Sequence, residues 1–285
     1  MLRSWLLVPA DDEAKMGKAI GVGADALVLD LSSMPERKKA NARANAVTFL
    51  ASQSQQVVAR RRFARWVRIN PIGSPHWKED LVAVMQAKPE GIVLPRALGP
   101  QHVQTLAAEI YELEQGGPAE HNSTRIVPQV GDVAEGALAI PGFAQDPHPR
   151  ILGLSWDMSA FAASAGMIGT ENDAVRAVRA QLLFTAKARG LMAIESASGV
   201  VKKQDVLEQA VKRARMTGFD AMMARHPAQV PVIEKLFTPT EGDLVAARNI
   251  VSAFELASEA QVLTVDGRAV DRIDLTRARR MLDEA

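Results

Sequence analysis

The sequence predicts an α/β fold, a (β/α)8 TIM barrel, with a C-terminal extension made of helices and a hairpin. Short apolar runs alternate with longer stretches of helical spacing, which is typical of a parallel sheet with helical crossovers. Eight such units fill about 235 residues, close to the ~250 residues of a usual barrel. A doubly wound open sheet is the alternative, but Pro9-Ala10-Asp11 stands where its glycine-rich loop would follow the first strand.

The eight predicted strands are short and mostly apolar, and Ala26–Asp30 in particular is typical of a strand buried on both faces. They cover Trp5–Val8, Ala26–Asp30, Trp66–Ile69, Gly91–Leu94, Arg125–Val130, Ile151–Ser155, Leu191–Glu195 and Ala221–Arg225. The predicted barrel helices are rich in alanine. They cover roughly Asp12–Val22, Pro35–Ser54, Trp77–Ala87, Pro100–Glu114, Val133–Ile140, Asn172–Arg189, Lys203–Thr217 and Ala228–Leu236.

The pattern changes after Phe237, so we place the barrel in residues 1–237 and the extension in residues 238–285. Thr240–Ser258 is predicted to form a helix with Thr240 as its N-cap. The next stretch alternates around Asp266-Gly267, a hairpin signal, and Arg272–Glu284 is predicted to form a final helix. We expect the extension to pack on the barrel or on a neighbouring subunit.

Composition excludes several classes of function. The 34 basic and 33 acidic residues leave a net charge of +1, which argues against nucleic-acid and anionic-membrane partners. We interpret the short basic run Arg60-Arg61-Arg62 with Arg65 as a solvated loop. The chain has no cysteine, so disulfides and thiolate chemistry are excluded. The apolar stretch Trp5–Pro9 is too short for a signal peptide or a membrane span, and we expect a cytoplasmic protein.

Polar side chains gather at the predicted carboxyl ends of the strands, where barrel enzymes carry out chemistry. Asp30 ends one strand, and Arg68 lies near the end of the next. An arginine flanked by apolar residues is costly to bury unless it meets an anion or a carboxylate. Arg68 is therefore either a clamp for a substrate carboxylate or the ion-pair partner of Asp30.

Two further groups have a catalytic and a structural interpretation. Glu195 ends the seventh strand and is either an acid–base group or an interior residue satisfied by its neighbours. His226, followed by Pro227, is either a catalytic histidine or the start of a helix, and the second interpretation is favoured. No Ser/His/Asp arrangement or close metal-binding pair has support in the local sequence.

Several stretches together resemble the citrate lyase beta subunit family, the acyl-CoA lyases within the HpcH/HpaI aldolase group. The order and spacing of these stretches, which run almost from end to end, carry the resemblance. They are Arg3–Pro9, Gly23–Leu31, Pro35–Lys38, Val67–Asn70, Gly91–Pro95, Gly218–Asp220, His226–Val230, Phe237–Pro239 and Val265–Arg272.

The resemblance implies a trimer of barrels and cleavage or formation of a carbon–carbon bond in a 3-hydroxyacyl-CoA, such as citryl-, malyl- or citramalyl-CoA, or in a related 2-oxo acid. It implies magnesium as cofactor, because hard carboxylate oxygens bind this ion, and CoA as part of the substrate. Arg68 would bind the substrate carboxylate, and Asp132 would bind metal and substrate. Asp271 would be an acid that reaches the site from the extension. Pro9 and Lys18 would lie near the CoA phosphates.

The chain departs from the family pattern in three places, and each departure reduces carboxylate character. Ser32 and Ser33 stand where the family continues with Glu-Asp, the shorter Asp132 replaces a metal-binding glutamate, and Ala160 aligns with a metal-binding aspartate. Asp157 could compensate as a ligand only if its loop moves. We therefore expect magnesium affinity to be weak or lost, and Arg68 to lose partners and bind a free anion more readily.

Three hypotheses follow. A carbon–carbon lyase with an altered metal site would use Asp30, Arg68 and Asp271 as catalytic residues, with Asp132 and Asp157 as candidate metal ligands. A non-catalytic, ligand-binding relative is the alternative. A metal-independent enzyme with Glu195 or Asp132 as general base has the least support.

Overall fold

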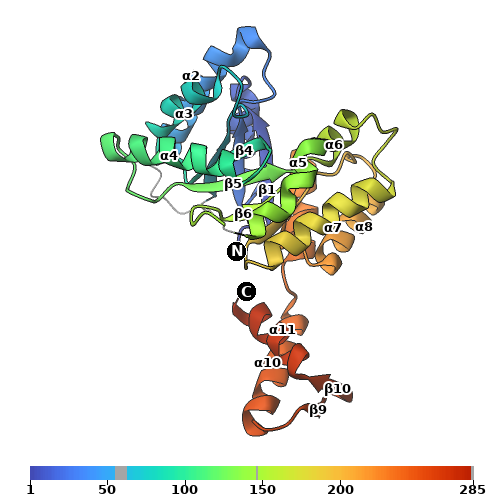
Figure 1. Ribbon diagram of the computed structural model, residues 1–285. Helices are drawn as coiled ribbons and strands as arrows, with labels where there is room; N and C mark the ends of the chain where they lie inside the picture. Colours follow the sequence, from blue (N-terminus) through green and yellow to red (C-terminus); the bar gives the residue numbers. More distant parts are fainter. Residues whose placement is uncertain (55–62, 146, 284–285) are drawn as a thin grey trace. The chain divides into compact units, whose positions relative to one another are not determined.

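Eight parallel strands form a nearly closed barrel in the computed structural model, which describes residues 1–54, 63–145 and 147–283 (Figure 1). The strands pair in the order β5-β4-β3-β2-β1-β8-β7-β6. Two isolated parallel bridges, Ile126 with Ile151 and Gln129 with Ser155, join β5 to the chain around β6. The predicted barrel is confirmed. The strands are β1 Ser4–Pro9, β2 Ala26–Asp30, β3 Ala64–Arg68, β4 Gly91–Ala97, β5 Arg125–Val130, β6 Gly153–Leu154, β7 Met192–Glu195 and β8 Ala221–Ala224.

Helices flank the sheet, and α2, α3 and α4 pack in sequence along one side of it (Figure 1). No helix in the described ranges is long and apolar enough to cross a bilayer. The α-helices are α1 Glu13–Ala19, α2 Lys39–Ser54, α3 Trp77–Met85, α4 Pro100–Gly116, α5 Ala134–Ala139, α6 Met158–Ser164, α7 Asp173–Lys187, α8 Gln204–Thr217 and α9 Val230–Phe237, and the 3-10 turns are η1 Glu36–Lys38, η2 Ile140–Ala144 and η3 Pro227–Gln229.

The register of the first three strands places three predicted site residues in one row. Asp30 is paired in register with Pro9 on β1 and with Arg68 on β3. All three are the last residues of their strands, so the row lies at the carboxyl-terminal mouth of the barrel. The strict parallel register of β1, β2 and β3 thus fixes the position of Asp30 beside Arg68.

The inner core depends on two tryptophans and one glycine. The rings of Trp5 and Trp66 are fully buried, with centroids 4.7 Å apart. Gly91 starts β4 beside Trp66, and a Cβ atom there would lie 2.2 Å from the Trp66 ring. The close approach of backbone and ring therefore requires glycine at this position.

Three expectations differ from the structure. The predicted strand Ile151–Ser155 has regular pairing only over Gly153–Leu154. An unpredicted helix, α6, follows because the Asp157 side chain accepts hydrogen bonds from the N–H groups of its first turn. Arg60 to Arg62 of the basic run lie outside the described residues. Arg65 is not solvated, because its guanidinium pairs with Glu90 and its side chain is only 11% exposed.

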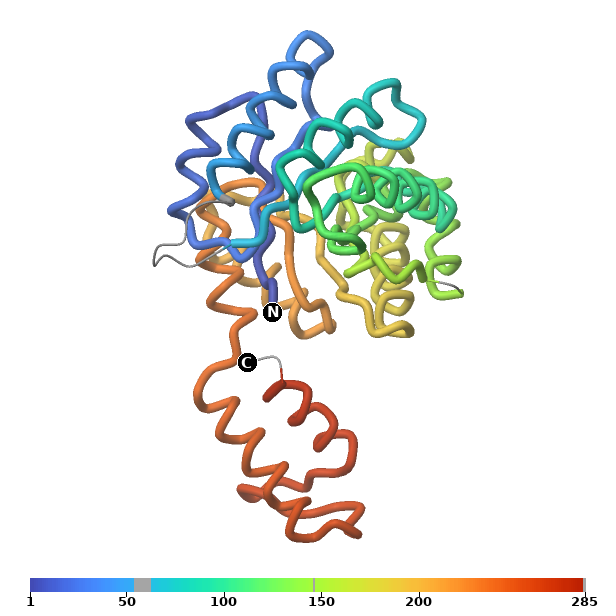
Figure 2. The backbone as a smooth tube through the Cα atoms, turned by 90° about the vertical axis from the view of Figure 1, so that its left-hand side faces the viewer, coloured from blue at the N-terminus to red at the C-terminus, as the bar shows by residue number. Residues whose placement is uncertain are grey.

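The C-terminal part forms a second compact unit, Lys235–Ala285 together with Met1, whereas Leu2–Glu234 forms the first. Helices α10 Glu241–Leu256 and α11 Arg272–Asp283 pack side by side around a small core of Phe254, Val270 and Leu275 (Figure 2). The predicted hairpin is confirmed as β9 Val262–Val265 and β10 Arg268–Asp271. Its turn residues have positive φ, +49° at Asp266 and +75° at Gly267, which suits this turn chemistry.

Gly91→Ala should lower the free energy of unfolding by about 1–3 kcal/mol, because the added methyl group must displace the Trp66 ring in a filled core. Urea unfolding followed by tryptophan fluorescence measures this change. Gly17→Ala on α1 is the matched control, since nothing lies within 4 Å of the position that its added methyl group would take. The control should be neutral or stabilising by up to ~1 kcal/mol. Equal effects of the two substitutions would contradict the packing argument.

Candidate functional site

Asp30 and Arg68 form an ion pair at the barrel mouth. Arg68 Nη1 lies 3.3 Å from Asp30 Oδ1 and 3.4 Å from Oδ2, and its Nε donates to Gln129 Oε1 at 2.5 Å. The Asp30 and Arg68 side chains are only 11% and 13% exposed, so the pair is shielded from water. Arg68 is therefore the ion-pair partner of Asp30, and its guanidinium also lies at the barrel mouth, where a clamp for a substrate carboxylate is expected. Both interpretations of Arg68 stay open.

Ser32 and Ser33 complete this cluster. The Ser32 hydroxyl donates to Asp30 Oδ1 at 2.8 Å, and the Ser33 hydroxyl donates to Oδ2 at 2.6 Å. Arg68 Nη1 in turn donates to Ser32 Oγ at 2.5 Å. The expectation that Arg68 loses partners is wrong, because its Nη1 donates to the hydroxyl oxygens of Ser32 and Ser33 as well as to Asp30.

These contacts set the charge state of Asp30. Burial alone would raise the pKa of the Asp30 carboxyl, but the Arg68 guanidinium and the hydroxyls of Ser33 and Ser32 outweigh burial and hold this pKa below its ordinary value. Asp30 is therefore ionised at neutral pH and is a poor proton acceptor. The role of Asp30 is to hold the Arg68 guanidinium in a fixed orientation.

A pocket of about 380 Å³ opens above the cluster, within the larger unit. Pro9 lines this pocket, whereas Lys18 on the exposed face of α1 does not, and their predicted place near the CoA phosphates stays a prediction. The lining brings together residues at or just after the carboxyl ends of six strands, which is the usual construction of a barrel active site. The lining residues are Leu7, Pro9, Asp30, Ser33, Met34, Arg68, Gln129, Asp157 and Arg225.

Asp132 is buried, does not line this pocket, and is fixed by the backbone. Gly131 before it has φ of +76°, and a Cβ there would meet Val178 at 2.8 Å, so the turn needs glycine. The Asp132 oxygens accept main-chain N–H groups from Asp157 at 2.8 Å and Arg96 at 3.2 Å. The side chain is therefore held at both oxygens.

The surroundings of Asp132 favour its neutral form. Burial raises its pKa to about 7, and the neighbouring Asp157 carboxylate adds to this, against the lowering effects of Arg68 and of the two N–H donors. A hard cation would therefore have to compete with a proton for this carboxyl group, because it binds the carboxylate form.

Asp157 is occupied on both carboxylate oxygens. Oδ1 accepts the N–H groups of Ser159 at 3.0 Å and Ala160 at 3.1 Å and so caps α6. Oδ2 forms an ion pair with Arg225 Nη2. Asp157 and Asp132 are neighbours, as the predicted metal ligands should be, but each is already engaged by protein donors.

The donor set does not fit the implied magnesium site. Magnesium requires near-octahedral oxygen ligation, with at least one or two available carboxylates. Within the described ranges, no group of three or more His, Asp or Glu side chains is arranged to hold a metal ion. The two carboxylates that remain accept backbone N–H groups or a guanidinium, so no step of the chemistry is assigned to a metal here.

Asp271 belongs to the smaller unit, and its observed contacts are local. Its Oδ1 accepts the N–H groups of Ile273 at 2.8 Å and Asp274 at 3.0 Å, which makes it the N-cap of α11. Its role as a catalytic acid therefore stays a prediction.

Glu195 and His226 each have the structural role that was the alternative to a catalytic one. Glu195 accepts from Trp156 Nε1 at 2.9 Å and from Arg179 Nε at 2.5 Å, so it is a satisfied interior residue and not a free general base. His226 Nδ1 accepts the N–H of Ala228 at 3.1 Å and caps η3, together with Gln229 in a capping box.

The sequence analysis missed Gln129 as a contributor to the pocket, and it placed Arg225 at a strand end without giving it a role. Gln129 aligns Arg68 from across the barrel, and Arg225 provides a second guanidinium at the mouth. Gln129 is a buried polar residue near the carboxyl end of a mostly apolar strand, and Arg225 directly follows a buried one. A polar residue at the carboxyl end of a buried strand is the signal that identifies both.

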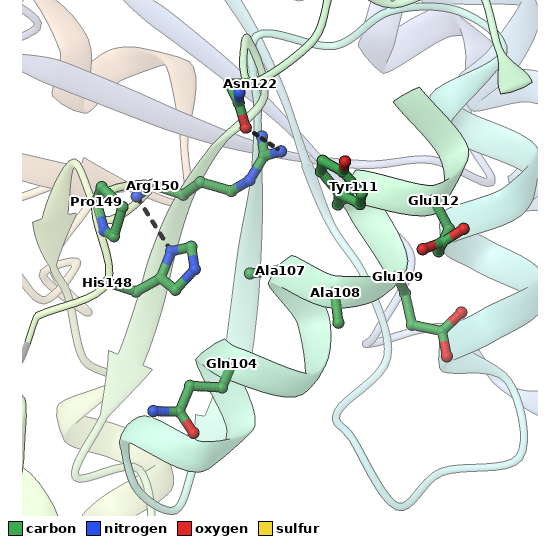
Figure 3. A pocket seen from close by; sticks show the side chains of 10 residues that line it. All are labelled: Gln104, Ala107, Ala108, Glu109, Tyr111, Glu112, Asn122, His148, Pro149 and Arg150. Carbon is green, nitrogen blue, oxygen red and sulfur yellow. Dashed lines mark hydrogen bonds between the residues drawn. The ribbon is translucent and has the colours of Figure 1, made fainter. Parts of the chain in front are cut away.

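A second hollow, of about 530 Å³, lies along α4 and includes none of the predicted site residues (Figure 3). Arg150 at its edge donates to Glu114, to Asn122 and to the Thr124 carbonyl, so this guanidinium is saturated by structural contacts. The candidate site is therefore the pocket at the barrel mouth.

A family model described as HpcH/HpaI aldolase/citrate lyase matches residues 3–227. The chain belongs to this family. The resemblance drawn from the sequence motifs is confirmed.

The relatives include enzymes that act on CoA thioesters. The (3S)-malyl-CoA thioesterase of Cereibacter sphaeroides is 28% identical over 287 residues, which span 99% of this chain and 94% of the relative. The mitochondrial citramalyl-CoA lyase of Rattus norvegicus is 28% identical over 265 residues, 89% of this chain and 76% of the relative. The crystal structure of protein CitE from Mycobacterium tuberculosis, in complex with magnesium, acetoacetate and coenzyme A, has a TM-score of 0.76 and 26% identity, and the match covers 99% and 97% of the two chains.

Asp30→Asn should lower the unfolding free energy of this family member by about 3–5 kcal/mol at pH 7, because it leaves Arg68 buried without its charged partner. Since the pKa of Asp30 is lowered in the folded state, its stabilising contribution is present above the unfolded pKa and is lost as pH falls through the folded pKa. The wild type should therefore lose stability more steeply than the variant below about pH 4.

Urea unfolding at pH 7 and across the acid range measures both effects. Asp173→Asn is the control, because the Asp173 carboxylate is 97% exposed and its ion pair is with the exposed Arg176. Parallel acid profiles for the wild type and Asp30→Asn would contradict the assigned ionisation of Asp30.

Proposed function

We propose that this chain is a carbon–carbon lyase of the aldol or Claisen type, acting on a 3-hydroxyacyl-CoA such as citryl-, malyl- or citramalyl-CoA, or on a related 2-oxo acid. The observation that carries this proposal is the position of Arg68. It is a guanidinium fixed at the mouth of the barrel, in a family whose relatives include a citramalyl-CoA lyase and a malyl-CoA thioesterase.

Arg68 is arranged to bind a carboxylate. Its Nε and Nη1 are held by Gln129, Asp30 and Ser32, whereas Nη2 has no hydrogen-bond partner among the residues that the structure describes. A planar guanidinium with a fixed orientation and a vacant donor is suited to a carboxylate ligand. Fixing the guanidinium in advance reduces the entropy lost when the ligand binds.

The reaction needs a base, an electron sink and an acid. A base takes the proton of the 3-hydroxyl group, the adjacent carbon–carbon bond breaks, and its electron pair moves to the thioester as an enolate. One product is then a 2-oxo acid, held by Arg68, and the enolate takes a proton to become the acyl-CoA product. We assign the acid to Asp271 of the extension, and the approach of CoA to Pro9 and Lys18. These roles, and a homotrimer in which the extension reaches a neighbour, rest on the family resemblance.

A non-catalytic ligand-binding protein is the second candidate. The observation that favours it is the saturation of Asp157 by Arg225 and by the α6 N–H groups, in a site whose donor set does not fit magnesium. Such a protein would bind the same carboxylate at Arg68 without turning it over.

Incubation of the purified protein with malyl-, citramalyl- and citryl-CoA, followed by chromatography of the CoA products, tests the lyase. We expect cleavage of at least one substrate to its acyl-CoA product. Product analysis separates this cleavage from thioester hydrolysis, which would release free CoA. Absence of turnover with all three substrates at high protein concentration would contradict the proposal and favour the binding protein.

Arg68→Ala should lower kcat/KM on the active substrate by roughly 10²-fold, because a charge-assisted hydrogen bond to the substrate carboxylate is lost. Arg176→Ala is the matched control, since this exposed arginine on α7 pairs with the exposed Asp173 and does not line the pocket. Equal activities of the two variants would rule out Arg68 as the carboxylate-binding residue.

A further inference from the structure

Arg225 brings a second positive charge to the pocket. It directly follows β8, and its main-chain N–H donates to Gln229 Oε1 at 2.9 Å, which fixes the start of the side chain. Gln229 is itself buried and donates to the carbonyl groups of Ser198 and Val200. The base of Arg225 is therefore rigidly held, while its side chain is 45% exposed in the pocket mouth.

The guanidinium of Arg225 is only partly used by the protein. One terminal nitrogen, Nη2, pairs with Asp157 Oδ2. In the described parts of the chain, its Nε and Nη1 have no hydrogen-bond partner, and neither does Nη2 of Arg68. Two guanidinium groups that line one pocket thus keep donors for a ligand.

The charge arrangement favours an anion over a cation. Each carboxylate that lines the pocket already has a guanidinium partner, Asp30 with Arg68 and Asp157 with Arg225. A divalent cation would have to displace Arg225 and the helix-capping N–H groups before it could reach Asp157. An anion needs no such displacement, because the vacant donors belong to cationic groups.

We propose that Arg225 and Arg68 together hold the carboxylate and the 2-oxo oxygen of a 2-oxo acid by direct hydrogen bonds, in place of a divalent cation. This inference rests on the proposed function for the class of ligand. It assigns Arg225 as a binding residue and makes ligand binding independent of metal. The two guanidinium groups supply the positive charge that binds the negatively charged 2-oxo acid.

Isothermal titration calorimetry with pyruvate as the probe tests this assignment on the whole chain. We expect the same Kd in EDTA and in magnesium chloride, within about twofold. Arg225→Leu should weaken binding by about tenfold or more, because a charged donor is lost. Arg176→Leu, the matched control, should bind as the wild type does. Circular dichroism and thermal melting confirm that each variant is folded.

Asp157→Asn separates the two-arginine site from a metal site. Asparagine still caps α6 but releases Arg225 from its ion pair, so pyruvate should bind at least as tightly as in the wild type. If Asp157 were a metal ligand, the same substitution would weaken binding in magnesium. Binding that needs magnesium, unchanged binding by Arg225→Leu, or no heat in either buffer would overturn the inference. Turnover is measured separately, so these results do not depend on whether the lyase proposal holds.

Discussion

The parallel register between β2 and β3 is the constraint on which the site depends. It pairs Asp30 with Arg68 at the ends of two buried strands, so that an ionised carboxylate and a guanidinium meet where water is largely excluded. A slip of one residue between these strands would turn one of the two side chains to the other face of the sheet. Ser32 and Ser33 also bond to the Asp30 oxygens, and Gln129 accepts from Arg68 Nε, which fixes the guanidinium but leaves its Nη2 without a partner among the described residues.

The second organising feature is the way in which the site balances its charges. A magnesium site needs carboxylates that face the pocket and have no other partner, so that the ion can bind them. Here the buried Asp132 is held by main-chain N–H groups and is partly protonated near neutral pH, and Asp157 pairs with Arg225. Both carboxylates that line the pocket are thus engaged by protein donors, whereas guanidinium donors of Arg68 and Arg225 have no partner in the described parts of the chain.

Much of the fold could be predicted from the sequence, since each barrel strand is a short apolar run and the strands alternate with helical spacing. The position of Asp30 beside Arg68 also followed from the strand ends. The effect of Ser32 and Ser33 could not be predicted, because composition shows the loss of charge but not the hydroxyl contacts that replace it. Helix α6 was missed because its start depends on one capping side chain, Asp157. The ion pair between Asp157 and Arg225 was missed because it joins residues far apart in the chain.

A crystal structure of the protein soaked with pyruvate and manganese chloride tests the two-arginine site most directly, because manganese scatters anomalously and can stand in for magnesium. We expect pyruvate to lie between the guanidinium groups of Arg68 and Arg225. Arg225 then either keeps its ion pair with Asp157 or bonds to the pyruvate carboxylate instead. Our account predicts no anomalous peak beside Asp132 and Asp157. A manganese ion bound to these two carboxylates and chelated by pyruvate would contradict it.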